Sequence, residues 1–126
     1  MITLEDYFGR VSYIAKPSDE IEANARELLL RVNALLVAIG FKTTVNSGWR
    51  PPAYNATVPG ASPTSKHMSG QAIDLADPAG ELDDVLFNDQ RLLIEHQLWM
   101  EHPLATKGWT HLQSIPPRSG NRVFFP

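Results

Sequence analysis

The sequence predicts a single α+β domain, residues 1–126, in which a small antiparallel sheet is flanked by helices. One long segment has helical periodicity, several short segments alternate as strands do, and ten prolines and eight glycines separate them. Helices and antiparallel strands in this mixed order are typical of α+β architecture. A chain of 126 residues is also long enough for one domain to bury its own core.

The clearest element is a helix from about Asp19 to Ile39. Asp19, followed three residues later by Glu22, resembles a capping box, and Gly40 stands where a left-handed residue commonly ends a helix. We interpret the apolar side of this helix as core and assign it no function. Its apolar residues recur at helical spacing: Ile21, Ala25, Leu28, Leu29, Val32, Leu35, Leu36 and Ile39.

Shorter elements follow this helix. The segment FKTTV, residues 41–45, predicts a strand, and an irregular stretch then continues to about Ser69. A loop of that length inside a compact domain usually has a functional reason. The segment QAIDLA alternates, with Ile73 and Leu75 on one face and Asp74 on the other, and predicts a half-buried strand.

The second half of the chain predicts one more helix and three strands. The helix extends from Gly80 to about Gln97 and is weaker than the first. The segments LWMEH and WTHLQ predict two strands joined by a turn that contains proline and glycine, and RVFF predicts a short terminal strand.

Composition excludes several function classes. A formal net charge of −3 with scattered basic residues does not suit nucleic-acid binding, and no apolar run is long enough to span a membrane. The acidic N-terminal segment lacks an apolar signal core, so we expect cytoplasmic synthesis without a signal peptide, and we expect a monomer. Because the chain has no cysteine, disulfides are excluded and nitrogen and oxygen atoms must hold any metal.

One carboxylate interrupts an apolar strand and needs a partner. Asp74 lies between strand-like apolar residues, where a buried charge costs free energy unless another group satisfies it. His67 lies seven residues earlier, Gly70 lets the chain turn between them, and His111 shares a strand face with Gln113. If the two strands are neighbours, His67, Asp74 and His111 converge, and a cation would be the partner of Asp74. Two alternatives remain open: Asp74 points to solvent, or it only hydrogen-bonds His67.

Three motifs resemble the zinc D-Ala-D-Ala carboxypeptidase family. This group of cell-wall peptidases includes dipeptidases and L-Ala-D-Glu endopeptidases of phage lysins, and shares the hedgehog/DD-peptidase fold. The motifs occur in the family's order and span about half of the chain. They are SGWRPPAYN (Ser47–Asn55), Ser65-x-His67-x-x-Gly70-x-Ala72-x-Asp74, and Trp109-x-His111.

The resemblance implies a zinc site and a substrate. It makes His67, Asp74 and His111 the ligands of Zn²⁺ and matches Arg50 to an arginine that faces the substrate carbonyl or carboxylate. Such a guanidinium donates paired hydrogen bonds and stabilises developing negative charge. The other interpretation of Arg50 is a surface residue that holds a loop. Ser65 supports the metal ligands and lies with Arg50 among the residues expected at the substrate.

The sequence departs from the family pattern at the catalytic base. Many members have an acidic residue three positions before the final histidine, where this chain has Gly108. Strand register decides which nearby residue replaces it, because opposite residues of an antiparallel pair share a face. If Glu101 lies opposite His111, it can act as the base; a register shifted by one residue would present His102 instead. We favour Glu101 as the residue that takes a proton from the metal-bound water.

These observations lead to two hypotheses about function. In the first, the protein is a zinc peptidase that cleaves D-Ala-D-Ala or L-Ala-D-Glu bonds of peptidoglycan stem peptides, as a phage or prophage lysin that acts on the cell wall. In the second, it is a non-catalytic metal-binding domain of the same fold that binds wall peptides or has a structural role in a phage particle. The glycine at position 108 favours the second.

Overall fold

The longest element of the computed structural model, which describes residues 1–126, is helix α2, Asp19–Ile39. Its predicted bounds are confirmed, and Gly40 ends it with φ of +66°. The predicted cap is wrong by one residue, because the hydroxyl of Ser18 accepts the backbone N–H of Ile21. Ser18 has the extended backbone that a capping residue needs, whereas Asp19 is already helical.

Five strands form one sheet in the order β1-β2-β4-β3-β5. Neighbouring strands are antiparallel, except that β5 is parallel to β3. The predicted α+β class, with a small and mostly antiparallel sheet, is therefore confirmed. The strands are β1 (Val45–Ser47), β2 (Ala72–Asp77), β3 (Trp99–Glu101), β4 (Gly108–Gln113) and β5 (Val123–Phe124).

Strand register places three polar side chains on one face of the sheet. Asp74 of β2 lies opposite His111 of β4. Met100 of β3 lies opposite Leu112, so the next pair along the two strands is Glu101 and His111. Because directly opposite residues point to the same side of a sheet, Asp74, His111 and Glu101 share a face.

Two predicted elements differ from the structure. The predicted strand 41–45 begins only at Val45, because the preceding residues make isolated contacts with the end of β2 rather than a ladder. The predicted helix 80–97 is two helices, α4 (Glu81–Asn88) and α5 (Arg91–Glu95). Asp89 interrupts them with φ of −135° and ψ of 77°, and asparagine followed by aspartate favours such a turn.

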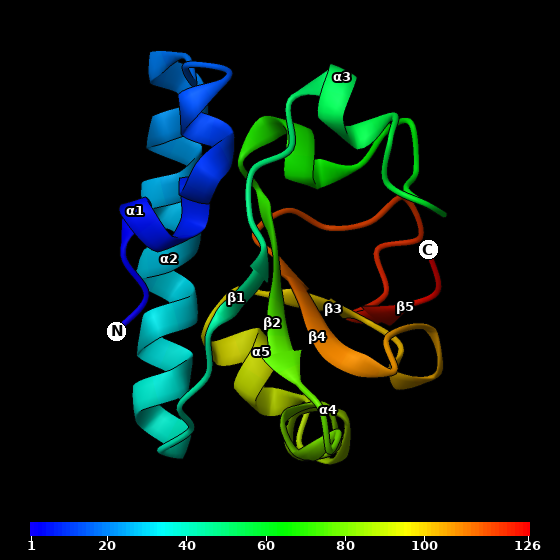
Figure 1. The fold of residues 1–126 in the computed structure, drawn as a ribbon. Helices are drawn as coiled ribbons and strands as arrows, with labels where there is room; N and C mark the ends of the chain where they lie inside the picture. Colours follow the sequence, from blue (N-terminus) through cyan, green and yellow to red (C-terminus); the bar gives the residue numbers. More distant parts are fainter.

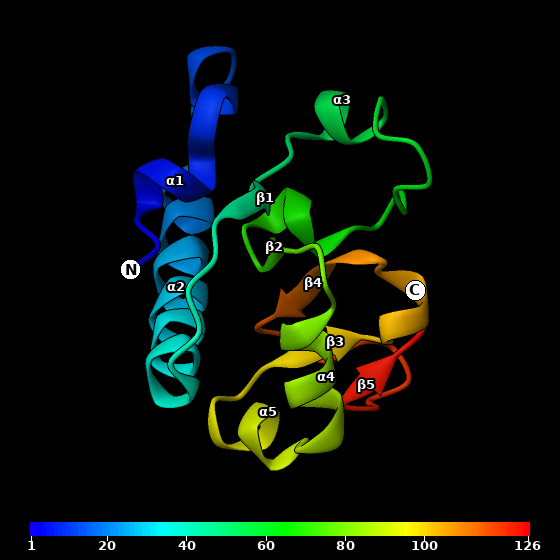
Figure 2. The same ribbon diagram turned by 60° about the horizontal axis from the view of Figure 1, so that its bottom comes forward.

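The core lies between the helices and the other face of the sheet. Figures 1 and 2 show α2 along one side of the sheet, with α4 and α5 at one end. Ile73, Leu112 and Met100 lie in adjacent strands of this sheet, and each is completely buried. Strand β2 is more deeply buried than predicted, since Ala72 and Asp74 on its other face are also covered. None of the helices has the length and apolar composition needed to span a bilayer.

The long segment between β1 and β2 folds over the polar face. It contains α3 (Pro52–Asn55) and a 3₁₀ turn, η2 (Lys66–Ser69). Two hydrogen bonds hold its ends together, from the indole Nε1 of Trp49 to the carbonyl of Met68 and from the N–H of Arg50 to the carbonyl of His67, each 3.0 Å long. The two ends of the segment are therefore held together beside the polar side chains of the sheet. The remaining helices are α1 (Leu4–Phe8) and the 3₁₀ turns η1 (Gly9–Tyr13) and η3 (Pro103–Ala105).

Candidate metal centre

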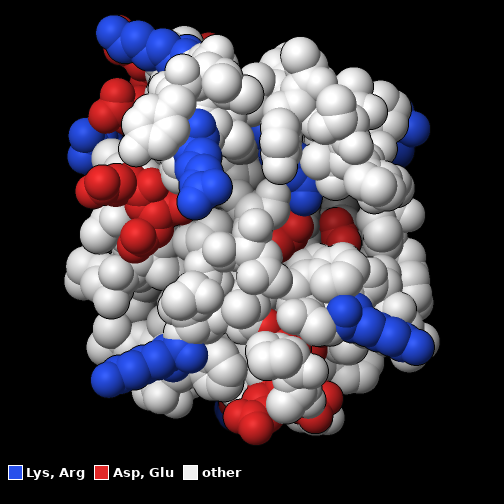
Figure 3. Space-filling view, in the orientation of Figure 1, with Lys and Arg blue, Asp and Glu red and all other residues white.

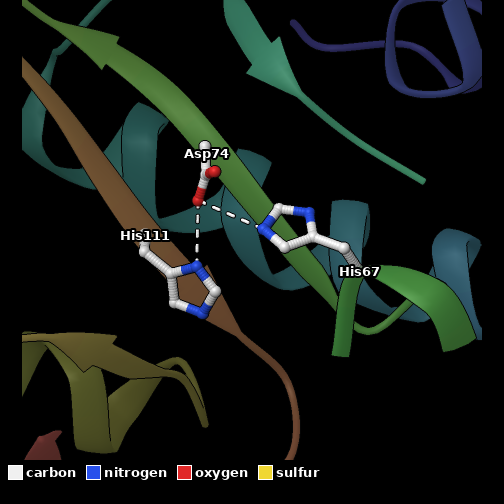
Figure 4. Close-up of side chains that lie close together, drawn as sticks. All are labelled: His67, Asp74 and His111. Atoms are coloured by element: carbon white, nitrogen blue, oxygen red, sulfur yellow. Dashed lines mark hydrogen bonds and ion pairs between the residues drawn. The ribbon is translucent and has the colours of Figure 1, made fainter. Parts of the chain in front are cut away.

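Two imidazoles and a carboxylate from three separate elements converge on one point. One ligand atom from each of His67, Asp74 and His111 lies within 4.8 Å of the other two, and all three residues are buried. Figure 4 shows the two rings directed at the same carboxylate oxygen. Asp74 Oδ1 lies 3.2 Å from His67 Nε2 and 2.9 Å from His111 Nδ1. The convergence that the sequence predicted is therefore present.

The turn η2 positions His67. The hydroxyl of Ser65 accepts the backbone N–H of His67 at 3.2 Å and begins the turn. Gly70 ends it with φ of +77°, a conformation that favours glycine. A Cβ at this position would lie only 2.7 Å from the carbonyl oxygen of Ile21, so the turn also packs tightly against α2. Gly70 thus allows both the reversal and the close approach that bring His67 to the sheet.

A backbone carbonyl determines which nitrogen of His67 faces Asp74. His67 Nδ1 lies 2.7 Å from the carbonyl oxygen of Gly48, which can only accept a hydrogen bond. Nδ1 therefore carries the hydrogen, and Nε2 points at Asp74. Burial lowers the pKa of His67, and the opposing effect of Asp74 is smaller, so the ring is neutral. A lone pair of Nε2 then faces a carboxylate oxygen, an arrangement that a cation between them would satisfy.

His111 directs Nδ1 at Asp74, whereas His67 directs Nε2. Burial alone would lower its pKa, but the hydrogen bond to Asp74 and the charges of Glu101 and Asp74 outweigh burial and raise it. In the metal-free protein Nδ1–H therefore donates to Asp74. Metal binding requires a neutral ring, so a metal ion would take the place of this proton. The donor set of two imidazole nitrogens and one carboxylate oxygen thus fits a divalent metal.

Asp74 is ionised although it is buried. Burial opposes ionisation, but the hydrogen bond from His111 Nδ1–H outweighs it and lowers the pKa of the carboxyl group. Its second oxygen, Oδ2, accepts a hydrogen bond from Arg50 Nη2 at 3.0 Å, and both side chains of this ion pair are only 11% exposed. Asp74 is thus neither solvent-exposed nor bonded to His67 alone. Each of its oxygens has a cationic or donor partner.

The side chain of Arg50 is largely covered, with 11% of it exposed, which does not fit a surface residue that only holds a loop. Besides the ion pair with Asp74, its Nε donates to the hydroxyl of Ser47 at 2.8 Å. The two contacts fix the guanidinium beside the metal group. The sequence did not predict the contact with Asp74, because it joins residues from different elements.

Glu101 faces the site and His102 faces away from it. Glu101 Oε2 lies 3.4 Å from His111 Nδ1, its side chain is 17% exposed, and burial raises its pKa. The His102 ring stacks on Phe125, and its Nδ1 accepts the backbone N–H of Leu104. Of the two residues proposed to replace Gly108, the register therefore presents Glu101. Its role as the base stays a prediction.

Sequence reasoning missed two groups that orient the rings. One is the backbone carbonyl of Gly48, which no side-chain pattern could indicate. The other is the side chain of Gln113, whose Oε1 lies 2.8 Å from His111 Nε2. Its place two residues after His111, on the same strand face, was a usable signal.

The site lies under the segment that carries α3. The space-filling view shows acidic atoms in a recess below this segment, with basic atoms beside them (Figure 3). The carboxylates of Asp74 and Glu101 each keep a small exposed fraction, 11% and 17%. Solvent therefore reaches the edge of the site, while the ligand atoms themselves are sheltered.

Comparison with known proteins identifies the family. A family model described as Peptidase M15 matches residues 5–112, which include all three residues of the metal group and most of the chain. No curated protein and no solved structure gives a match. The motifs, the α+β fold and the family model agree. The chain belongs to the M15 peptidase family.

Proposed function

We propose that the protein is a zinc-dependent peptidase that hydrolyses peptide bonds in peptidoglycan stem peptides. Family membership supports a peptidase, and the buried group of His67, Asp74 and His111 carries the proposal, because it joins three N and O ligand atoms in one place. The motif resemblance favours a D-Ala-D-Ala carboxypeptidase or an L-Ala-D-Glu endopeptidase. A phage or prophage endolysin that acts on the cell wall would be the setting.

His67 Nε2, Asp74 Oδ1 and His111 Nδ1 would hold the zinc ion. Three protein ligands with an open position are the usual set of a catalytic zinc site. When bound, zinc supplies a water molecule with a pKa near ~7 and polarises the scissile carbonyl. Several divalent metals suit two imidazoles and a carboxylate, and the family resemblance is what favours zinc among them.

Glu101 would hold and move the proton. It lies beside His111, and burial raises its pKa, so the carboxyl group accepts a proton more readily than an exposed glutamate does. Its Oε2 would take the proton of the attacking water and pass it to the leaving amine. The neighbouring strand β3 would thus supply the base that many other members carry three residues before the final histidine.

Arg50 and Ser65 would bind the substrate. A guanidinium has five N–H donors, and Arg50 uses one on Ser47 and one on Asp74, which leaves others for a substrate carbonyl or carboxylate. The Ser65 hydroxyl accepts the His67 N–H and can still donate its own hydrogen. Arg50 would then have two tasks, to orient Asp74 and to stabilise negative charge on the carbonyl oxygen.

The experiment combines zinc content with peptide release from purified cell walls. We expect one bound zinc in the wild type, no zinc and no release with His67→Ala, and bound zinc with Glu101→Gln. Loss of a general base lowers turnover by roughly 10²- to 10⁴-fold. His102→Gln is the matched control and should retain turnover. Loss of metal without loss of turnover, or full turnover by Glu101→Gln, would contradict the mechanism.

A second candidate function has one observation in its favour. Gly108, where many other members have an acidic residue, is exposed and carries no side chain, which suits a non-catalytic domain that binds wall peptides or has a structural role in a phage particle. In that case the wild type would bind zinc and wall peptides but release no product from any wall type. If Glu101→Gln also bound zinc and wall peptides as the wild type does, this result would support the non-catalytic function.

A further inference from the structure

We propose that Gln113 is a positioning residue that keeps the hydrogen of His111 on Nε2 and thereby presents Nδ1 to the metal ion. This inference rests on the metal site of the proposed function but not on its peptidase activity. Gln113 is 4% exposed and ends strand β4. It does not take part in the group of three ligands, and its side chain contacts His111 from the side opposite Asp74.

The orientation of the Gln113 amide follows from its second partner. Gln113 Nε2 donates to the backbone carbonyl of Ile115 at 2.8 Å. If the amide were reversed, its oxygen would face that carbonyl, and two acceptors would lie 2.8 Å apart. Gln113 Oε1 must therefore face His111, and an amide oxygen can only accept a hydrogen bond. Because Oε1 lies 2.8 Å from His111 Nε2, Nε2 carries the hydrogen.

The chain around Ile115 is itself held in place. The backbone N–H of Ser114 donates to the carbonyl of Gln71 at 3.0 Å, and Arg31 Nη1 donates to the carbonyl of Ser114 at 2.9 Å. These contacts fix the segment that contains the Ile115 carbonyl against β2 and α2. The acceptor that orients the Gln113 amide is thus part of a rigid framework.

The consequence for His111 is a single available nitrogen. With hydrogen on Nε2, only Nδ1 has a lone pair for a metal, and Nδ1 lies 2.9 Å from Asp74 Oδ1 and 3.4 Å from Glu101 Oε2. His67 has the opposite arrangement, because the Gly48 carbonyl holds the hydrogen on Nδ1 and leaves Nε2 free. The two histidines therefore use different ring nitrogens, and each is set by a partner outside the ligand group.

The test measures zinc affinity and the protonation of the His111 ring. Zinc affinity is measured by competition with a chelator for the wild type, Gln113→Leu, Gln113→Glu and the control Gln90→Leu. Gln90 is an exposed residue whose side chain contacts only a nearby carbonyl. Loss of such an orienting partner typically lowers metal affinity about 10- to 100-fold, which we expect for Gln113→Leu. Gln113→Glu keeps an acceptor oxygen at Nε2 but turns its other oxygen toward the Ile115 carbonyl, so we expect a zinc affinity between those of Gln113→Leu and the wild type.

Nitrogen-15 NMR of the zinc-bound wild type gives a readout that does not depend on any variant folding. We expect His111 to carry hydrogen on Nε2 and His67 to carry it on Nδ1. Hydrogen on Nδ1 of His111, or equal zinc affinity of folded Gln113→Leu and wild type, would overturn the inference. A wild type that binds no zinc would end both proposals. Weakened zinc binding by Gln113→Leu in a protein without hydrolysis would uphold this inference and reject the peptidase.

Discussion

The ion pair between Arg50 and Asp74 makes a quantitative prediction about stability. Both side chains are 11% exposed, and Arg50 Nη2 lies 3.0 Å from Asp74 Oδ2. Arg50→Met removes the cation and leaves Oδ2 of the buried Asp74 carboxylate without a partner, which costs about 3–5 kcal/mol. At an unfolding entropy of about 2.1 cal/mol/K per residue, a chain of 126 residues would then melt roughly 11–19 °C lower.

Scanning calorimetry on chelator-treated protein measures this effect without stabilisation by metal. Arg50→Lys keeps a positive charge but loses the contact of Nε with Ser47, so we expect an intermediate melting temperature. Arg91→Met is the matched control, because its ion pair with Asp89 is exposed and its melting temperature should stay close to that of the wild type. If Arg50→Met melts within a few degrees of the wild type, the ion pair does not stabilise the site as we reason.

Three further predictions concern the metal and two other positions. Zinc at 100 times its Kd stabilises a protein that binds it by about 2.7 kcal/mol, so thermal scans should show a rise of roughly 10 °C in the wild type and none in His67→Ala. Burial and nearby Asp77 raise the pKa of Asp83, whose Oδ1 has no hydrogen-bond partner, so the folded state binds this proton more tightly than the unfolded state does. The stability that protonation of Asp83 contributes is complete below its unfolded pKa and is lost as pH rises through the folded value. Urea midpoints from pH 4 to 8 should therefore fall further in the wild type than in Asp83→Asn, in which the other groups titrate unchanged, and parallel curves would contradict it. Gly70→Ala should lower the urea midpoint, because the left-handed backbone alone costs about 1–2 kcal/mol and the new Cβ would also approach the Ile21 carbonyl; an unchanged midpoint would show that the turn can relax.

Periodicity predicted the elements that bury a continuous apolar side. Helix Asp19–Ile39 and strand β2 have the bounds or nearly the bounds expected, because packing and local pattern agree there. The interruption at Asp89 was missed, since leucines on both sides of it continue an approximate helical spacing. Strand β1 was placed too early because its start depends on pairing with Leu75 and Asp74, which the local sequence does not contain.

The metal ligands could be predicted from the sequence, but the groups that orient them could not. His67, Asp74 and His111 have chemically distinctive side chains at motif spacing, so their convergence could be inferred before the strands were placed. The register that turns Glu101 toward His111 could be stated only as one of two options. The carbonyl of Gly48 and the Arg50–Asp74 contact depend on how the loop folds back over the sheet, and this information lies in the tertiary structure alone.

The parallel pairing of β5 with β3 has a practical consequence for handling the protein. Phe124 lies opposite Glu101, its carbonyl accepts the N–H of His102 at 2.7 Å, and its ring meets His111 edge to face. A purification tag fused after Pro126 would therefore begin next to the proposed reaction centre and could obstruct large wall fragments. Met1 is almost fully exposed and lies beside α2, across the molecule from β5 (Figure 1). Attachment at the N-terminus leaves the recess open for binding and turnover measurements.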